Sequence, residues 1–205
     1  MKSLRIALLA GAALLAAAGA GVLHAQNTPA APDPTKAPPA PRVRTSPHET
    51  ISTVIGDRRT GPRITITYGR PHTKDPRSGE MRQIWGGLVP WDKAWRLGAD
   101  EATLLLTTAP LTFGDTTIPA GAYTLYLVPS ERGETRLAFS STLGKWGVPV
   151  DESKDVARVS MTRHAIETPL DQLAIGLEGD PSGTGGLLKV AWEKTVFTAP
   201  FTVAK

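Results

Sequence analysis

Side chains suited to binding or chemistry crowd into one segment, residues 84–103. It holds three of the five tryptophans together with charges of both signs. Aromatic faces beside charged groups suit stacking on sugar rings or docking on a protein. With one arginine from upstream, the candidates for a binding or structural polar cluster are Arg70, Trp85, Trp91, Lys93, Trp95, Arg96, Asp100 and Glu101.

Asp100 and Glu101 are the candidates for acid–base chemistry, which would make the protein a hydrolase of cell-envelope material. Adjacent residues of a strand point to opposite faces, so these carboxylates can cooperate only if the backbone turns there. A hydrolase also needs a carboxylate with a raised pKa in a concave pocket. The sequence leaves catalysis open, favours a protein without enzymatic activity, and identifies no catalytic residue.

A structural role for the same cluster rests on arginine chemistry. Arg70 or Arg96 would pair with Glu101 inside a ring of tryptophans, because arginine binds a carboxylate through two parallel hydrogen bonds. In a β domain without disulfides, large aromatic side chains lie more often in the core than on the surface. We therefore expect at least two of the three clustered tryptophans to be buried.

Familiar cofactor and metal sites have no counterpart in this sequence. The chain has no cysteine, which removes disulfides, thiolate nucleophiles and cysteine-based metal sites. His72 and His164 lie far apart in the sequence, and a zinc site needs further ligands. Neither a P-loop nor a G-x-S-x-G turn occurs. We predict no metal and no cofactor.

The N-terminal residues predict export. Residues 1–25 combine a basic start, an uncharged run rich in Ala and Leu, and small residues, as in a secretory signal peptide. Cleavage after Ala20 or Ala25 fits, and an uncleaved anchor is the alternative. Without Lys2 and Arg5, the 23 basic residues become 21 against 19 acidic ones. This balance argues against a nucleic-acid partner, which requires a clustered basic face.

The rest of the chain divides into a tether and one domain. Residues 26–47 are rich in proline and alanine and predict a disordered tether. Residues 48–205 are long enough to form a single core. We expect a periplasmic or extracellular protein with no stable membrane insertion after signal cleavage. Its partner is unknown, and an envelope protein or a glycan is the candidate.

Alternating apolar and polar residues predict β-strands, because successive side chains of a strand point to opposite faces. The strand candidates are residues 50–55, 63–68, 103–107, 123–128, 136–140, 157–162, 172–177, 187–193 and 196–203. One or two helical turns are expected, at residues 91–97 and 152–155. The pattern predicts an all-β, antiparallel two-sheet sandwich, with a closed or partly open β-barrel as the alternative.

Several sequence signatures occur in a fixed order. They are Tyr68-Gly69-Arg70-Pro71, IWGGLVPWDKAWRLGADEAT at residues 84–103, IPAGAYTL at residues 118–125 and Ala191-Trp192-Glu193-Lys194. In this order they resemble the bacterial family called domain of unknown function 2911, over about Glu49 to Val203. The resemblance implies an exported, mostly β protein and implies no reaction. This chain departs from the family pattern with Gly69 in place of Ser and Asp100 in place of Asn.

Three functions follow from these observations. The first expectation is a structural or interaction domain of the cell envelope. The alternative is a module that binds a carbohydrate-like ligand through exposed tryptophan faces. The second alternative is an envelope hydrolase that uses Glu101 and Asp100.

Overall fold

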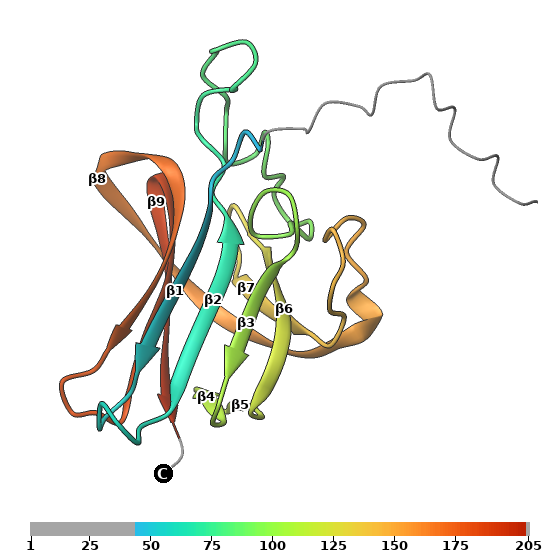
Figure 1. Ribbon diagram of the computed structural model, residues 1–205. Coiled ribbons are helices and arrows are strands. Elements are labelled where there is room, and N and C mark those ends of the chain that lie inside the picture. Colours follow the sequence, from blue (N-terminus) through green and yellow to red (C-terminus); the bar gives the residue numbers. More distant parts are fainter. Residues whose placement is uncertain (1–43, 204–205) are drawn as a thin grey trace, which may run out of the picture. The chain divides into compact units, whose positions relative to one another are not determined.

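Nine antiparallel strands and one 3-10 turn make up the fold in the computed structural model, which describes residues 44–203 (Figure 1). The strands pair in the order β1-β2-β3-β6-β7-β8-β9-β4-β5. They are β1 (His48–Val54), β2 (Arg63–Gly69), β3 (Thr103–Thr107), β4 (Leu111–Phe113), β5 (Thr116–Ile118), β6 (Gly121–Val128), β7 (Thr135–Ser140), β8 (Asp155–Gly179) and β9 (Gly185–Val203). The predicted all-β antiparallel class is confirmed. The predicted signal peptide and residues 26–43 of the predicted tether lie outside the described residues.

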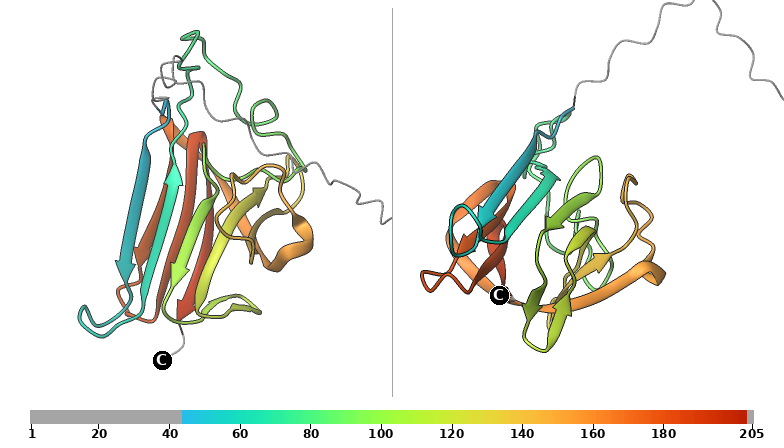
Figure 2. Two further views of the ribbon diagram at one scale, coloured as in Figure 1. Left: turned by 45° about the vertical axis from the view of Figure 1, so that its right-hand side comes forward. Right: turned by 60° about the horizontal axis from the view of Figure 1, so that its bottom comes forward.

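The core lies between β1–β3 and the long pair β8–β9, which face each other across it (Figure 2). The predicted alternation is confirmed in β2 and β9. The alternating buried residues include Ile64, Ile66 and Tyr68 in β2, and Leu188, Val190 and Trp192 in β9. The two sides are also linked by a hydrogen bond, in which the backbone N–H of Ile175 donates to the hydroxyl of Tyr68 at 2.9 Å.

β8 and β9 are each longer than the sequence suggested. β8 pairs with β7 through residues 155–161 and with β9 through residues 162–179. The candidates at 157–162 and 172–177 are therefore parts of one strand, and the last two candidates merge in the same way into β9. Register shifts interrupt the β8–β9 pairing between Ala165 and Ala174. Such irregularities bend a strand and let it serve two neighbours.

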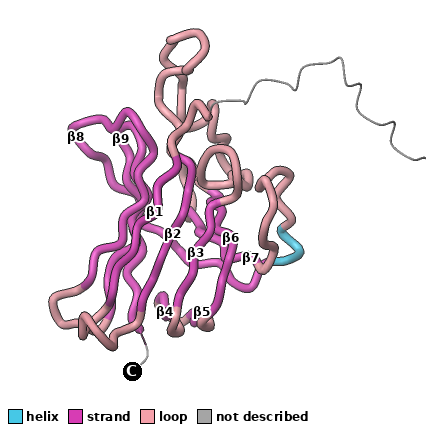
Figure 3. Tube along the Cα trace, in the orientation of Figure 1, coloured by secondary structure: helices cyan, strands magenta, loops and turns pink. Residues whose placement is uncertain are grey.

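Two local predictions need correction. The β4–β5 hairpin was missed, because three-residue strands are too short to show alternation. The helical turn expected at residues 91–97 does not form (Figure 3). Asp92 and Leu97 have φ angles of 58° and 56°, which a right-handed helix cannot accommodate. Trp95 instead exchanges two backbone hydrogen bonds with Leu127, each 2.8 Å long. The turn predicted at residues 152–155 is confirmed as a 3-10 turn, Glu152–Lys154.

Two connections position the polar residues. Residues 70–102, between β2 and β3, carry the tryptophan-rich segment across one end of the sheet, and residues 141–154, between β7 and β8, lie beside it (Figure 1). Residues 44–47, at the end of the predicted tether, contact this end, where Arg70 N–H donates to the carbonyl of Pro47 at 2.8 Å. Within residues 44–203, no helix has the length and apolar character needed to cross a membrane.

Candidate functional site

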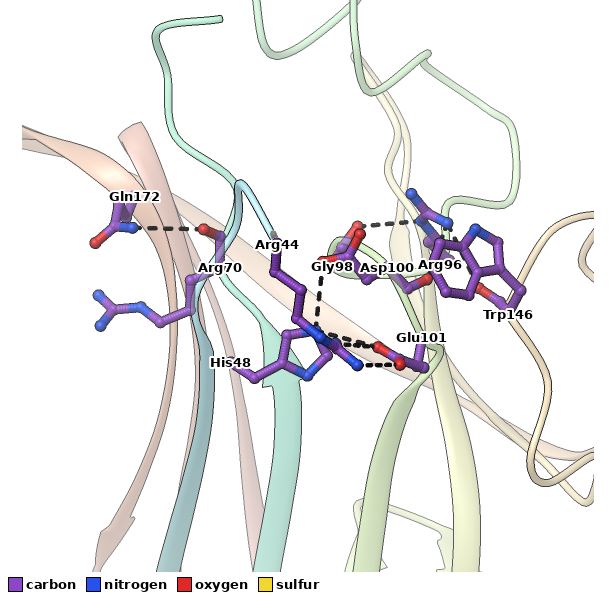
Figure 4. A network of polar contacts seen from close by, with 9 residues as sticks. All are labelled: Arg44, His48, Arg70, Arg96, Gly98, Asp100, Glu101, Trp146 and Gln172. Carbon is purple, nitrogen blue, oxygen red and sulfur yellow. Dashed lines mark hydrogen bonds and ion pairs between the residues drawn. The ribbon is translucent and has the colours of Figure 1, made fainter. Parts of the chain in front are cut away.

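Charged side chains meet where β1 begins, β2 ends and β3 begins (Figure 4). Arg44 binds both carboxylate oxygens of Glu101, and the Nη1–Oε2 distance is 2.5 Å. The same Nη1 lies 2.7 Å from Nε2 of His48. That imidazole nitrogen is also 3.3 Å from Oε2 of Glu101 and 3.6 Å from Oδ2 of Asp100. His48 therefore faces both adjacent carboxylates.

The backbone turn that cooperation between these carboxylates requires is present. Asp100 has a φ angle of 62°, in the left-handed region that aspartate tolerates better than most residues. Asp100 and Glu101 precede β3 rather than lying in it, so strand alternation does not separate their side chains. Both carboxylates consequently reach the same imidazole.

Glu101 carries a negative charge at neutral pH. Hydrogen bonds from Arg44 lower its pKa to about 2, with help from its own backbone N–H and the nearby His48. The same hydrogen bonds raise the pKa of Arg44. A general acid must hold its proton near neutral pH. Glu101 lacks the raised pKa that the hydrolase hypothesis required.

The predicted pairing of Arg70 or Arg96 with Glu101 is wrong. Arg96 donates to the backbone carbonyls of Gly98 and Asp100, at 3.3 and 3.0 Å, and so braces its own loop. Arg70 lies 3.4 Å from a carboxylate oxygen of Glu49 and donates to the carbonyl of Leu173. Glu101 is bound by Arg44 instead, outside the tryptophan cluster. Lys93, another candidate, is exposed and forms no ion pair within residues 44–203.

The tryptophans of the segment form an aromatic cluster that closes one end of the core. Trp85 stacks on Trp91 at 6.0 Å and packs edge-to-face against Phe197 at 5.1 Å, while Trp95 stacks on Trp192 at 5.9 Å. Trp85 is buried, whereas Trp91 and Trp95 are half-buried. The expectation that at least two of the three would be buried is wrong, because Trp91 and Trp95 each keep part of their surface exposed.

A cleft of about 390 Å³ lies next to this cluster, and we call it the motif cleft. Residues from three of the sequence signatures line it, among them Pro71, Trp95, Arg96, Asp100 and Trp192. Two of these contribute buried polar atoms that have no hydrogen-bond partner in the described part of the chain, the donor Nε1 of Trp192 and the acceptor Oδ2 of Asp100. The cleft thus has an aromatic wall, and the unpartnered donor and acceptor are buried atoms of residues that line it.

A second concave region, the outer groove, lies on the face of the sheet that points away from the core. It consists of two adjoining hollows of about 430 and 370 Å³. Ala102, Thr124, Lys145 and Trp146 line both hollows, and Arg44, His48 and Glu101 line the larger one. Trp146 is 52 % exposed, an unusual position for the largest side chain.

Sequence reasoning missed Arg44, His48, Lys145 and Trp146. A signal existed for Trp146, a large aromatic side chain between Gly144 and Gly147 in a segment where no strand was predicted. Arg44 and His48 fell at the edge of the predicted tether and were passed over. Among the described residues, no three His, Cys, Asp or Glu side chains gather closely enough to hold a metal ion.

Residues 46–201 match the family described as "Protein of unknown function (DUF2911)". The chain belongs to this family. The match confirms the resemblance carried by the sequence signatures, and the DUF2911 domain extends from the residues just before β1 into β9. No curated protein and no solved structure matches the chain.

Proposed function

We propose that this DUF2911 protein is an exported binding domain whose motif cleft holds a hydroxyl-rich ligand, such as one unit of a saccharide. The observation that carries the proposal is a pair of unpartnered buried polar atoms, Trp192 Nε1 and Asp100 Oδ2, in residues that line that cleft. A buried polar atom without a partner costs about 1–3 kcal/mol. Because both atoms are buried, the proposal requires the cleft lining to open as the ligand enters. A hydroxyl group both donates and accepts, so a polyhydroxylated ring can then pair with both atoms.

The aromatic wall supports the same class of ligand. Trp95 lines the cleft and is held in place by stacking on Trp192. A fixed indole face contacts the apolar face of a sugar ring at little entropic cost. Arg96 is fixed by carbonyls of its own loop, so its guanidinium is positioned before a ligand arrives.

Export and envelope location belong to the same proposal. They rest on the predicted signal peptide at residues 1–25, which places the domain in the periplasm or outside the cell. Glycans are the hydroxyl-rich polymers of that environment. An envelope glycan is therefore the first class of ligand to test.

A structural or interaction domain of the envelope is the second candidate. The aromatic cluster favours it, since Trp85 and Phe197 are buried and contribute to the core rather than to a contact surface. A hydrolase is less well supported, because Glu101 is an ion-paired carboxylate with a lowered pKa.

Titration with glucose, N-acetylglucosamine, maltotriose and chitotriose tests the binding proposal. We expect saturable heat in calorimetry with at least one of them. Asp100→Gly, which suits the positive φ angle and removes the carboxylate, should weaken that binding roughly tenfold or more, as expected for a lost hydrogen bond to a charged group. Lys93→Ala, which removes an exposed charge that does not line the cleft, is the control. If none of the four sugars binds, or Asp100→Gly binds as the native protein does, the proposal fails.

A further inference from the structure

The smaller hollow of the outer groove has an apolar interior. Its volume is about 370 Å³, at the lower end of the range of about 300–1,000 Å³ found for small-molecule sites. The connection 141–154 covers it from one side, with Val148, Pro149 and Val150 facing Tyr126 of β6. This is space for the apolar part of a ligand.

Two cationic side chains, Lys145 and Arg96, line this hollow. Neither forms an ion pair with a carboxylate among residues 44–203. The guanidinium of Arg96 lies over the ring of Trp146, 5.9 Å from its centroid, and is thereby held at the wall of the hollow. Burial lowers the pKa of Arg96, which reflects the cost of leaving this cation without an anionic partner. Both features favour an anion.

The remaining charges nearby do not cancel these two cations. Asp151 also lines the hollow, but its carboxylate accepts hydrogen bonds from the backbone N–H and the hydroxyl of Ser153, at 3.1 and 2.6 Å. Arg44 and Glu101 in the larger hollow neutralise each other. In the smaller hollow, Lys145 and Arg96 therefore outnumber the single carboxylate of Asp151, and its lining keeps an excess of positive charge.

We propose that the outer groove is a second binding site, for an amphipathic anion of the medium-chain fatty carboxylate class. The alkyl chain fills the hollow between Tyr126 and Val150, and the carboxylate lies between Lys145 and Arg96, beside Trp146. This site shares Arg96 and Val148 with the motif cleft and differs from it in its other lining residues. Lys145 lines only the outer groove and Asp100 lines only the motif cleft, so the two sites can be tested independently.

Calorimetric titration of the full chain with octanoate, decanoate and octylamine tests the proposal. We expect one saturable site per chain for the carboxylates. Decanoate should bind more than tenfold more tightly than octanoate, because each buried methylene contributes roughly fourfold. Octylamine, which has the same chain length and the opposite charge, should bind at least tenfold more weakly than octanoate. Equal affinity for octylamine and octanoate, or no saturation with decanoate, would overturn the proposal.

Two substitutions locate the binding site. Lys145→Glu reverses an exposed charge and should weaken decanoate binding at least tenfold, while Lys93→Glu, an exposed lysine outside the groove, should leave it unchanged. Val150→Glu places a charge in the alkyl hollow and should also abolish binding, with circular dichroism confirming the native fold. Sugar titration of Lys145→Glu should match the native protein, which separates this proposal from the motif-cleft proposal. Unchanged decanoate binding in Lys145→Glu would contradict the assignment.

Discussion

Arg44 and Glu101, separated by 57 residues in the sequence, form an ion pair in which one guanidinium binds both carboxylate oxygens. The pair joins the residues before β1 to the turn before β3 and places His48 beside two carboxylates. Both residues of the pair line the outer groove, whereas the adjacent Asp100 lines the motif cleft. The two adjacent acidic residues, Asp100 and Glu101, therefore line different concave surfaces.

The first prediction concerns the titration of Glu101. Its pKa is lowered from an ordinary value of 4.5 to about 2, chiefly by hydrogen bonds from Arg44. A lowered pKa in the folded state stabilises the fold above the ordinary value, and that contribution disappears as the pH falls from about 4.5 to 2. NMR titration of the Glu101 carboxyl carbon should give a midpoint near 2.

Arg44→Gln is the matched variant for this titration. It should move the Glu101 midpoint upward, toward the ordinary value, while His48 and Asp100 stay in place. A native midpoint near 4.5, or one that Arg44→Gln leaves unchanged, would show that the ion pair is not maintained in solution.

The second prediction concerns Tyr68, whose hydroxyl lies between the two sides of the core. It donates to Oε2 of Glu49 at 2.6 Å and accepts from the backbone N–H of Ile175 at 2.9 Å, and its burial raises its pKa to about 12. Tyr68→Phe leaves the N–H of Ile175 without an acceptor, which should lower the free energy of unfolding by about 1–3 kcal/mol. Urea denaturation measures this change.

Tyr123→Phe is the control for Tyr68→Phe. The hydroxyl of Tyr123 donates to the carbonyl of Pro119 at 2.9 Å, and Pro119 is exposed, so water can replace the lost donor. We expect a smaller loss of stability than for Tyr68→Phe. If both variants lose the same free energy of unfolding, the buried hydrogen bond between β2 and β8 contributes no more to stability than the hydrogen bond of Tyr123.

The third prediction contrasts two tryptophans. Trp85 is 9 % exposed and contacts Trp91, Trp95 and Phe197. Trp85→Ala should lower the free energy of unfolding by about 3–5 kcal/mol. Trp146 is largely exposed, so Trp146→Ala should change stability by about 0.5 kcal/mol or less. Thermal melts of the two variants check this contrast, and comparable losses would mean that Trp146 belongs to the core.

Local patterns in the sequence were sufficient to predict most of the strands but not the contacts of the polar site. Alternation in residues 63–68 and 187–193 identified buried faces, because strand periodicity is a property of a few consecutive residues. The same patterns could not show that β8 and β9 are continuous through their bends. Nor could they show that Arg44, rather than Arg96, reaches Glu101, because that choice depends on how distant segments pack.

One departure from the family pattern has a local explanation in the structure. Gly69 stands where the pattern has serine, and a Cβ atom at this position would lie 2.1 Å from the carbonyl oxygen of Ala99. The glycine therefore allows the turn before Asp100 to approach the end of β2 closely. Such a backbone contact could not be inferred from the sequence, because it depends on the path of residues 97–101.

The indole N–H signal of Trp192 in a proton–nitrogen NMR spectrum tests the central claim most directly. The proposal predicts that a bound saccharide accepts a hydrogen bond from this N–H, so its signal should move downfield and saturate, while the indole signal of Trp146 stays in place. Asp100→Gly should suppress the shift. A Trp192 signal unaffected by all four sugars, or a shift confined to Trp146, would contradict binding in the motif cleft.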